Sequence, residues 1–219
     1  MAECSSDNAG GVSCAAVGRE TSEPVAPSRA AKQRARILNA AELCFIQSGF
    51  HAASMGEIAK TANISAGLIY RYFNSKSEIV KAIIEGQLDS KYFRKIEQLS
   101  SAEDMSRSIL ETFDSWQRRD DPKLNPLLML ELTTESTRDD GIARAVRVKD
   151  RALGSSITAA VRRAALVRGA RLMPAAARSR AVMLQCLVEG LAMRVVRDPK
   201  LSRATLKPAL DAIVTVLMS

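Results

Sequence analysis

The stretch Ser54–Glu78, SMGEIAKTANISAGLIYRYFNSKSE, decides the fold of this chain. Ser54 and Glu57 have the S-x-x-E spacing of a capping box, in which the hydroxyl and the carboxylate each accept a hydrogen bond from a free amide at the start of a helix. Asn63-Ile64-Ser65 breaks the helical pattern, and Ser65 is placed to cap a second helix that begins at Ala66. The stretch therefore predicts two short helices joined by a tight turn.

A third helix is predicted directly after these two, because Ser75 and Glu78 repeat the capping-box spacing. Two short helices joined by a turn of a few residues form a helix-turn-helix, whose second helix lies in the major groove of DNA. We predict helices over about 55–62 and 66–73, the second being the recognition helix. Four large side chains are expected to pack in the core of this small domain and not to stack on bases: Phe45, Phe50, Ile69 and Phe73.

A longer run of matching positions extends from Arg34 to Ile79, about a fifth of the chain. It reads R-x-x-IL-x-AA-x-x-x-F-x-x-x-GF, then SM-x-EIA, then IS-x-G-x-IYRYF-x-SK. This run resembles the N-terminal domain of the tetracycline-repressor (TetR) family of bacterial transcriptional regulators. The resemblance implies an all-α homodimeric repressor that binds double-stranded DNA at a palindromic operator and is released by a small-molecule effector.

The resemblance also implies which residues contact DNA. Leu68 stands where family members often have threonine, and since leucine cannot donate a hydrogen bond, we expect apolar readout there, for instance against a thymine methyl group. Arg71 is expected to pair with a guanine edge or a phosphate, while Tyr70 and Tyr72 match family positions that touch the DNA backbone. The predicted DNA-binding residues are Ser54, Ser65, Ala66, Gly67, Leu68, Tyr70, Arg71, Tyr72 and Lys76.

Basic residues at two predicted helix starts leave alternatives open. Lys76 lies in a first helical turn, where the helix dipole disfavours a cation. A bound phosphate would reverse that balance, and the alternative is a solvated lysine. Lys32, Arg34 and Arg36 crowd the start of the first helix, where phosphate contact and a solvated helix end are equal alternatives.

The composition fits a globular, helical protein with a polyanionic partner. Of 219 residues, 47% are hydrophobic, and the formal net charge is +8. We predict a disordered tail over 1–29, a helix-turn-helix domain over 30–78 and a helical ligand-binding and dimerisation domain over 79–219, with about nine helices in all. The four scattered cysteines, the polar N-terminus and the lack of a membrane-length apolar run favour a soluble, cytoplasmic protein with no membrane partner.

No catalytic residue, cofactor or metal site is predicted. His51 is the single histidine and is expected at the domain surface. Glu131 and Glu135 lie one helical turn apart, and solvation or an ion pair with a nearby arginine is expected in place of an acid–base pair. An enzyme is therefore the least favoured class. The alternative to a ligand-responsive repressor is a structural or nucleoid-type DNA-binding protein without an effector, whose body would be packed solid.

Apolar residues at helical spacing predict further helices over about 76–99, 102–119, 126–137, 141–168, 174–197 and 203–218. No aromatic residue follows Trp116, so we expect a pocket that is mostly aliphatic and methionine-lined. Such a pocket would favour a flexible or aliphatic ligand over a large planar one. The candidate pocket residues are Met105, Ile109, Phe113, Trp116, Leu128, Met129, Met183 and Cys186.

The last two predicted helices resemble in position the pair that forms a four-helix dimer interface in the family. An apolar C-terminus buried within its own chain is the alternative. The apolar stripes of these helices supply the predicted dimer interface: Leu184, Leu187, Leu191, Val195, Leu210, Ile213, Val214 and Leu217.

Overall fold

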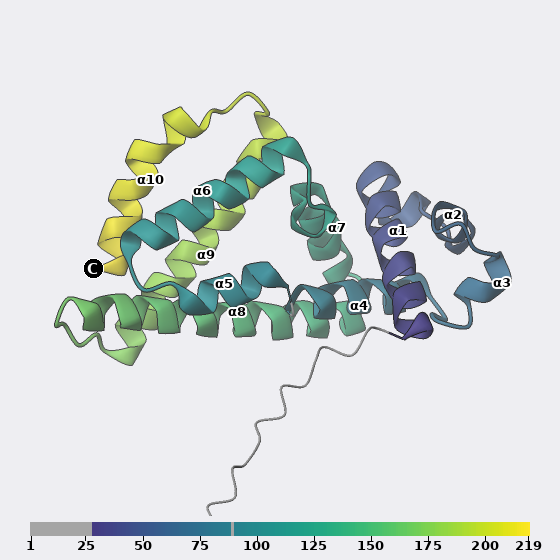
Figure 1. The fold of residues 1–219 in the computed structure, drawn as a ribbon, viewed down its shortest axis with the longest axis horizontal. Coiled ribbons are helices and arrows are strands. Elements are labelled where there is room, and N and C mark those ends of the chain that lie inside the picture. The colour runs from purple at the N-terminus through teal and green to yellow at the C-terminus, as the bar shows by residue number, and fades with distance from the viewer. Residues whose placement is uncertain (1–27, 89) are drawn as a thin grey trace, which may run out of the picture.

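A computed structural model describes residues 28–88 and 90–219, which form ten α-helices, one short 3-10 helix and no strand. The predicted all-α fold is therefore confirmed for this part of the chain. Of the expected tail over 1–29, residues 1–27 lie outside the described residues. A small head made by the first helices lies at one end, and a larger body made by the later helices extends away from it (Figure 1).

The head contains four helical segments, and the starts of the second and third are capped as the sequence predicts. Ser54 Oγ accepts a hydrogen bond from Glu57 N at 3.1 Å, and Glu57 Oε2 accepts one from Ser54 N at 2.7 Å, which completes the capping box. Ser65 Oγ accepts from Leu68 N at 3.2 Å. The segments are α1 (Arg29–Ala52), α2 (Met55–Thr61), α3 (Ala66–Ile69) and the start of α4 (Lys76–Leu88).

The start of α4 differs slightly from a capping box. Ser75 Oγ accepts from Glu78 N at 3.3 Å, as expected, but Glu78 Oε2 accepts from Asn74 N at 2.8 Å. The Glu78 carboxylate thus accepts from the amide of Asn74, whereas in a capping box it would accept from the amide of Ser75.

The core of the head continues into the body. The four predicted core residues, Phe45, Phe50, Ile69 and Phe73, are buried as expected. Leu128, Leu132 and Ile142, which lie on later helices, pack in the same apolar cluster. Head and body therefore share buried surface and do not meet through a polar linker alone.

The body consists of the later helices, packed around a second apolar cluster. In Figure 1, α4 and α5 follow each other along α8, while α6, α9 and α10 form the far end. The bounds are α5 (Lys91–Gln98), α6 (Ala102–Arg118), the 3-10 helix η1 (Pro122–Leu124), α7 (Pro126–Ser136), α8 (Asp140–Val167), α9 (Pro174–Arg197) and α10 (Arg203–Met218).

The predicted single helix over 76–99 is wrong, because two helices occupy this range. Ser90 Oγ accepts from Phe93 N at 3.3 Å and starts α5 as a separate helix. The apolar pattern runs through both segments because α4 and α5 both pack on α8. The other five predicted body helices agree with the observed bounds to within one residue.

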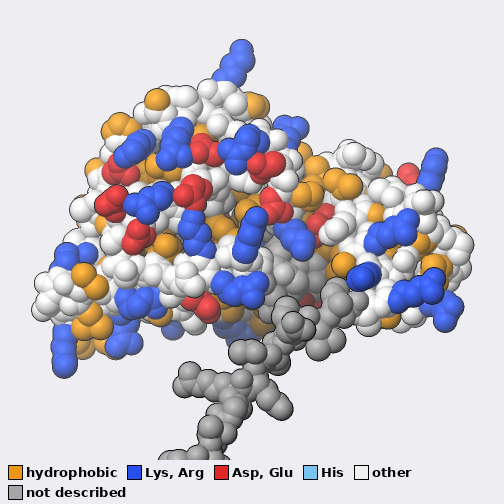
Figure 2. Space-filling model, viewed as in Figure 1, with side chains coloured by type: hydrophobic (Ala, Val, Ile, Leu, Met, Phe, Trp, Pro, Cys, Tyr) orange, Lys and Arg blue, Asp and Glu red, His pale blue; other side chains and the backbone are white. Residues whose placement is uncertain are grey.

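The surface differs in charge between the two parts. Basic side chains gather over the head, whereas acidic and basic side chains are interspersed over the body (Figure 2). No helix formed by residues 28–88 and 90–219 combines the length and the apolar character needed to span a bilayer.

Glu42 is a buried carboxyl group at the junction of head and body. It lies on α1 and is 2% exposed, and two charged side chains act on its charge: Lys123 of the neighbouring η1 and Asp121, which caps η1. Burial raises the pKa of Glu42 to about 7; Lys123 opposes this shift and Asp121 adds to it. A carboxyl group whose pKa is higher in the folded than in the unfolded state costs stability as the pH rises from the unfolded to the folded value.

Replacing Glu42 with glutamine should therefore stabilise the protein in a pH-dependent way. We expect Glu42→Gln to change the free energy of unfolding little near pH 4.5 and to raise it by up to about 3 kcal/mol near pH 8. Urea unfolding followed by circular dichroism across this range measures the difference. Glu85→Gln, on the exposed surface of α4, is the control. An equal gain for Glu42→Gln at every pH would contradict the assignment.

Candidate DNA-binding surface and body cavity

The predicted recognition helix is shorter than expected and presents one exposed edge. Only residues 66–69 are α-helical, and residues 70–72 form a turn. Ile69 and Phe73 point into the core of the head. The predicted DNA-contacting residues divide by exposure: Ser54, Ser65, Ala66, Gly67, Tyr70 and Arg71 are exposed, whereas Leu68, Tyr72 and Lys76 are half-buried.

Gly67 is a glycine that the chain itself does not require. A β-carbon built at this position would meet no atom within 4 Å, and the backbone there has no positive φ. Alanine is favoured over glycine in a helix by up to about 1 kcal/mol. The absence of a side chain at Gly67 leaves room for a partner to approach α3 closely from outside, as the predicted DNA contact requires.

Lys76 has partners within the chain that the sequence analysis did not foresee. Its Nζ donates to the carbonyl oxygens of Phe50 at 2.7 Å and His51 at 3.3 Å, and lies 4.5 Å from the centre of the Phe50 ring. Lys76 thus holds the end of α1. The predicted phosphate contact stays a prediction, and it would add to this structural role.

Two arginines near the start of α1 also hold the head together. Arg36 Nη2 donates to the carbonyl oxygen of Asn63 at 3.0 Å, in the turn between α2 and α3. Asn63 has a φ of 52°, a left-handed conformation that a tight turn requires. The guanidinium of Arg34 lies 4.5 Å from the centre of the Phe73 ring. Neither side chain is simply a solvated helix end.

The body contains a cavity of about 770 Å³. Four of the candidate pocket residues line it: Met105, Ile109, Trp116 and Met129. The other four do not. Phe113 and Leu128 are fully buried in the apolar clusters, and Met183 and Cys186 are exposed on the outside of α9. Helical spacing identified apolar residues correctly but could not tell which side of each helix borders the open space.

The cavity wall is more aromatic and more polar than predicted. Most of its apolar lining residues are aliphatic or methionine, in agreement with the expectation of a mostly aliphatic, methionine-lined pocket, but Tyr92 and Phe93 of α5 line it together with Trp116. That expectation considered the chain after Trp116 and overlooked the aromatic pair before it. The sequence analysis also missed the polar lining residues, which include Gln87, Lys149, Asp150, Gln185 and Glu189.

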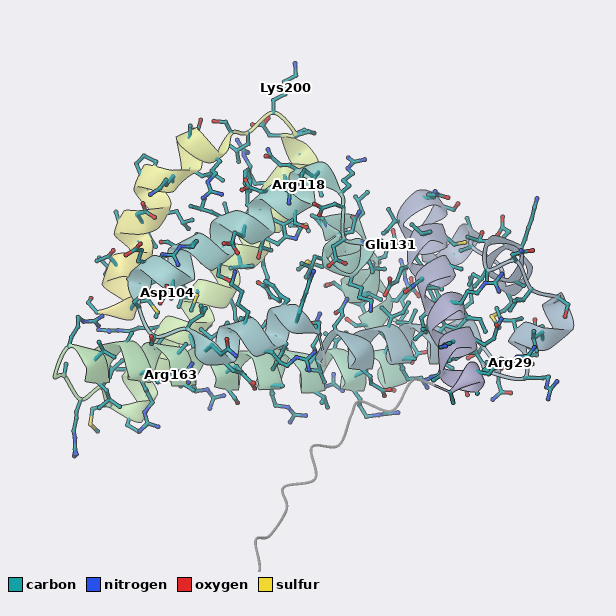
Figure 3. All side chains as sticks on the ribbon, in the orientation of Figure 1. Arg29, Asp104, Arg118, Glu131, Arg163 and Lys200 are labelled. Atoms are coloured by element: carbon teal, nitrogen blue, oxygen red, sulfur yellow. The ribbon has the colours of Figure 1, made fainter. Side chains whose placement is uncertain are left out.

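Helix α7 contacts both the cavity and the head. Met129, Leu132 and Thr133 line the cavity. From another side of the same helix, Glu131 Oε2 accepts a hydrogen bond from Phe50 N at 2.8 Å; Figure 3 labels Glu131 where α7 faces α1. A single helix of eleven residues thus connects a ligand-sized space to the end of α1.

Of the paired carboxylates of α7, Glu135 forms the expected ion pair with an arginine, whereas Glu131 accepts a backbone hydrogen bond from the head. Glu135 Oε1 lies 3.1 Å from Arg138 Nη1 and also 3.1 Å from His51 Nε2. His51 is at the surface, with a side chain that is 70% exposed. In residues 28–88 and 90–219, no group of three or more histidine, cysteine, aspartate or glutamate side chains could hold a metal ion.

Most of the predicted dimer-interface residues are buried within their own chain. Leu184, Leu191, Val195, Leu210 and Val214 lie in the core of the body, and Leu187 and Leu217 are half-buried; Ile213 alone of the eight is well exposed. The prediction took the most apolar stripe of each helix, and that stripe packs inside the body. The outward faces of α9 and α10 carry a second set of apolar residues: Val182, Met183, Cys186, Ile213 and Val216.

Two family models match the chain. The model of bacterial regulatory proteins of the tetR family matches residues 37–83, and the model of the BetI-type transcriptional repressor C-terminal domain matches residues 102–218. The second match alone covers more than half of the 219 residues. The first spans the helix-turn-helix, so it assigns DNA binding to the head.

Curated relatives include two regulators of the helix-turn-helix type. UidR of Escherichia coli strain K12 is 32% identical over 120 residues, which cover 53% of this chain and 58% of UidR. The chain thus spans somewhat more than half the length of this relative. BetI of Burkholderia thailandensis is 26% identical over 190 residues, which cover 84% of this chain and 93% of BetI.

Solved structures share the fold at low sequence identity. GusR of Salmonella enterica has a TM-score of 0.68 and 24% identity, covering 87% of this chain and 97% of GusR. FadR of Bacillus subtilis in complex with stearoyl-CoA has a TM-score of 0.64 and 20% identity, covering 84% of this chain and 97% of FadR. SmeT of Stenotrophomonas maltophilia in complex with triclosan has a TM-score of 0.67 and 23% identity, covering 84% of this chain and 91% of SmeT.

Adding one methyl group at Gly67 should weaken DNA binding without harming the fold. We expect Gly67→Ala to lower affinity for DNA by about tenfold, because the methyl group fills space that a close-packed partner needs. The free energy of unfolding should stay the same or rise by up to about 1 kcal/mol. Fluorescence anisotropy with a labelled duplex and urea unfolding measure the two effects.

Gly86→Ala is the matched control for this variant. Gly86 is also exposed and helical, and a β-carbon added there would meet no atom within 4 Å, but it lies on α4 away from α3. It should show the same stability change and unchanged DNA affinity. Equal affinity of Gly67→Ala and the parent protein would remove the argument that α3 approaches DNA at this point.

Proposed function

The chain belongs to the TetR family of bacterial transcriptional regulators, and we propose that it is a homodimeric repressor that binds a palindromic operator and leaves it when a small molecule enters the body. As a member of this family it is a regulator and not an enzyme. In the proposed role it acts in the bacterial cytoplasm, where its DNA target lies.

The observation that carries this proposal is the position of α7 between the cavity and the head. Met129 and Leu132 border the cavity, while Glu131 on the same helix accepts a hydrogen bond from Phe50 N. A ligand that changes the packing of Met129 and Leu132 also changes the position of Glu131, because all three belong to one short helix. If the ligand binds one position of α7 more tightly, DNA affinity depends on the ligand.

The cavity distinguishes this proposal from its alternative. A structural or nucleoid-type DNA-binding protein without an effector needs no open space in its body, whereas a space of about 770 Å³ is within the range of small-molecule sites. FadR with stearoyl-CoA and SmeT with triclosan have similar folds and bind organic molecules, which also supports an effector.

Selection of DNA from a random pool with the purified protein tests the proposal. Recovery of one inverted repeat is expected for a dimeric, sequence-specific regulator, because each head reads one half-site. Flat enrichment across sequences would favour the structural DNA-binding alternative.

The same selection should reveal the role of Arg71. This side chain is exposed, so its removal should not disturb the head. We expect Arg71→Ala to relax preference at one base position per half-site if the guanidinium reads a base, at a cost of about tenfold in affinity for the parent operator. A uniform loss over all sequences would instead identify a phosphate contact.

The outward face of α9 and α10 supports the proposed dimer. Ile213 and Val216 on α10 are 46% and 67% exposed, and Val182 and Met183 on α9 are 48% and 54% exposed. Two such faces related by a two-fold axis would bury these side chains against each other.

Placing a charge on this face should separate the subunits. We expect Val216→Glu to raise the dissociation constant of the dimer by about a hundredfold or more, because a two-fold axis brings two buried carboxylates together. Sedimentation equilibrium measures the change. Lys200→Glu, in the loop between α9 and α10 (Figure 3), adds a carboxylate away from these apolar side chains and should leave the dimer intact. A dimer of unchanged strength in Val216→Glu would show that subunits meet elsewhere.

A further inference from the structure

Lys149 is a half-buried cation in the wall of the cavity, whereas Lys91 and Lys123 at the same cavity are exposed. The Lys149 Nζ donates to Gln87 Oε1 at 2.9 Å. Gln87 Nε2 in turn donates to the carbonyl oxygen of Lys123 at 3.1 Å, which holds the amide oxygen of Gln87 toward the lysine. The ammonium group is therefore paired with a neutral amide in a partly dehydrated position.

The carboxylates around the cavity are engaged elsewhere or exposed. Asp121 accepts from Lys123 N at 3.0 Å as the cap of η1, and Asp150 accepts from Gln185 Nε2 at 2.9 Å. Glu189 is exposed on α9. Among residues 28–88 and 90–219, no carboxylate oxygen lies within 4.0 Å of the Lys149 Nζ.

The electrostatic balance at Lys149 favours an added anion. Burial lowers the pKa of Lys149, and the attraction of Asp150 and Glu189 does not offset this loss of hydration. A bound carboxylate would supply the missing counter-charge, and an ammonium–carboxylate hydrogen bond is stronger than one between neutral groups.

The rest of the wall fits an apolar or aromatic molecule. Tyr92, Trp116, Ile157 and Met193 line the cavity from four different helices. Trp116 is buried, and its indole N–H has no hydrogen-bond partner in the described part of the chain. The wall thus combines one half-buried cation, Lys149, with large apolar surfaces, the usual composition of a site for a small organic ligand.

We propose that the effector is a carboxylate with a compact apolar or aromatic body, whose carboxylate pairs with Lys149 while its body lies against Trp116 and Ile157. This inference rests on the proposed function, in which the cavity holds the effector. The expectation of a flexible or aliphatic ligand concerned only the shape of the molecule, and this inference adds its charge.

Matched probes that differ in one functional group test the proposal. The probes are 1-naphthaleneacetate, its primary amide and 2-(1-naphthyl)ethylamine, together with octanoate, octanamide and octylamine. Isothermal titration calorimetry with the full-length protein measures affinity. We expect at least one carboxylate to bind about tenfold more tightly than its amide and its amine.

Two variants locate the interaction. Lys149→Gln should weaken carboxylate binding by about tenfold and leave amide binding unchanged. Gln87→Glu keeps the lysine but places a carboxylate opposite it, so it should abolish the preference for carboxylates by satisfying Lys149 internally. Lys91→Gln, at an exposed lysine of the same cavity, is the control and should retain the preference. Circular dichroism melting curves confirm that each variant is folded.

The outcomes separate this inference from the proposed function. Preference for amides or amines, or carboxylate binding that is unchanged in Lys149→Gln, would overturn the carboxylate class while leaving a ligand-responsive regulator in place. Binding of none of the probes would also overturn the carboxylate class. Carboxylate binding that depends on Lys149 but does not release selected operator DNA would support the site and contradict the effector response.

Discussion

The turn Gly49–His51 near the end of α1 is held by opposite charges from two other helices, and the placement of the head on the body depends on this. Gly49 has a φ of 77°, which interrupts the helix and frees backbone groups on both sides. The Glu131 carboxylate accepts the hydrogen bond of Phe50 N, and the Lys76 ammonium donates to the carbonyls of Phe50 and His51. The Phe50 amide and the Phe50 and His51 carbonyls at the break are thus bound by charged side chains. Since Glu131 comes from α7 and Lys76 from α4, the same turn joins three parts of the chain.

Local chemistry made much of the fold predictable. The capping serines Ser54 and Ser65 each act on the amide three residues later, so the helix starts could be read from spacing alone. The division between α4 and α5 could not be read from spacing, because the apolar pattern continues across it. The only local signal of a new helix is the cap at Ser90, which stands within a long amphipathic stretch. Lys76 shows a similar limit. Its place in a first helical turn suggested an external anion, while its partners are backbone carbonyls 25 and 26 residues away.

The body illustrates why periodicity finds apolar faces but not what covers them. The stripe that includes Leu184 and Val214 is predicted at a subunit interface, yet both residues are buried within the chain. Met183, predicted in the pocket, is on the outside of α9. On helices with apolar residues on two sides, the sequence does not say which side meets the core, a cavity or solvent. The polar lining of the cavity is harder still to foresee, because Gln87 and Lys149 lie on different helices, 62 residues apart, and meet only in the folded chain.

The buried carboxyl group of Glu42 lowers the stability of the junction between head and body, because burial disfavours its charged form. With a pKa of about 7, the group is near half-ionised at neutral pH, so a fraction of the molecules carry a dehydrated charge where α1 meets η1. A protein selected only for rigidity would place a neutral side chain there. In the proposed regulator, lower stability at this junction would make it easier for a bound small molecule to change the position of the head.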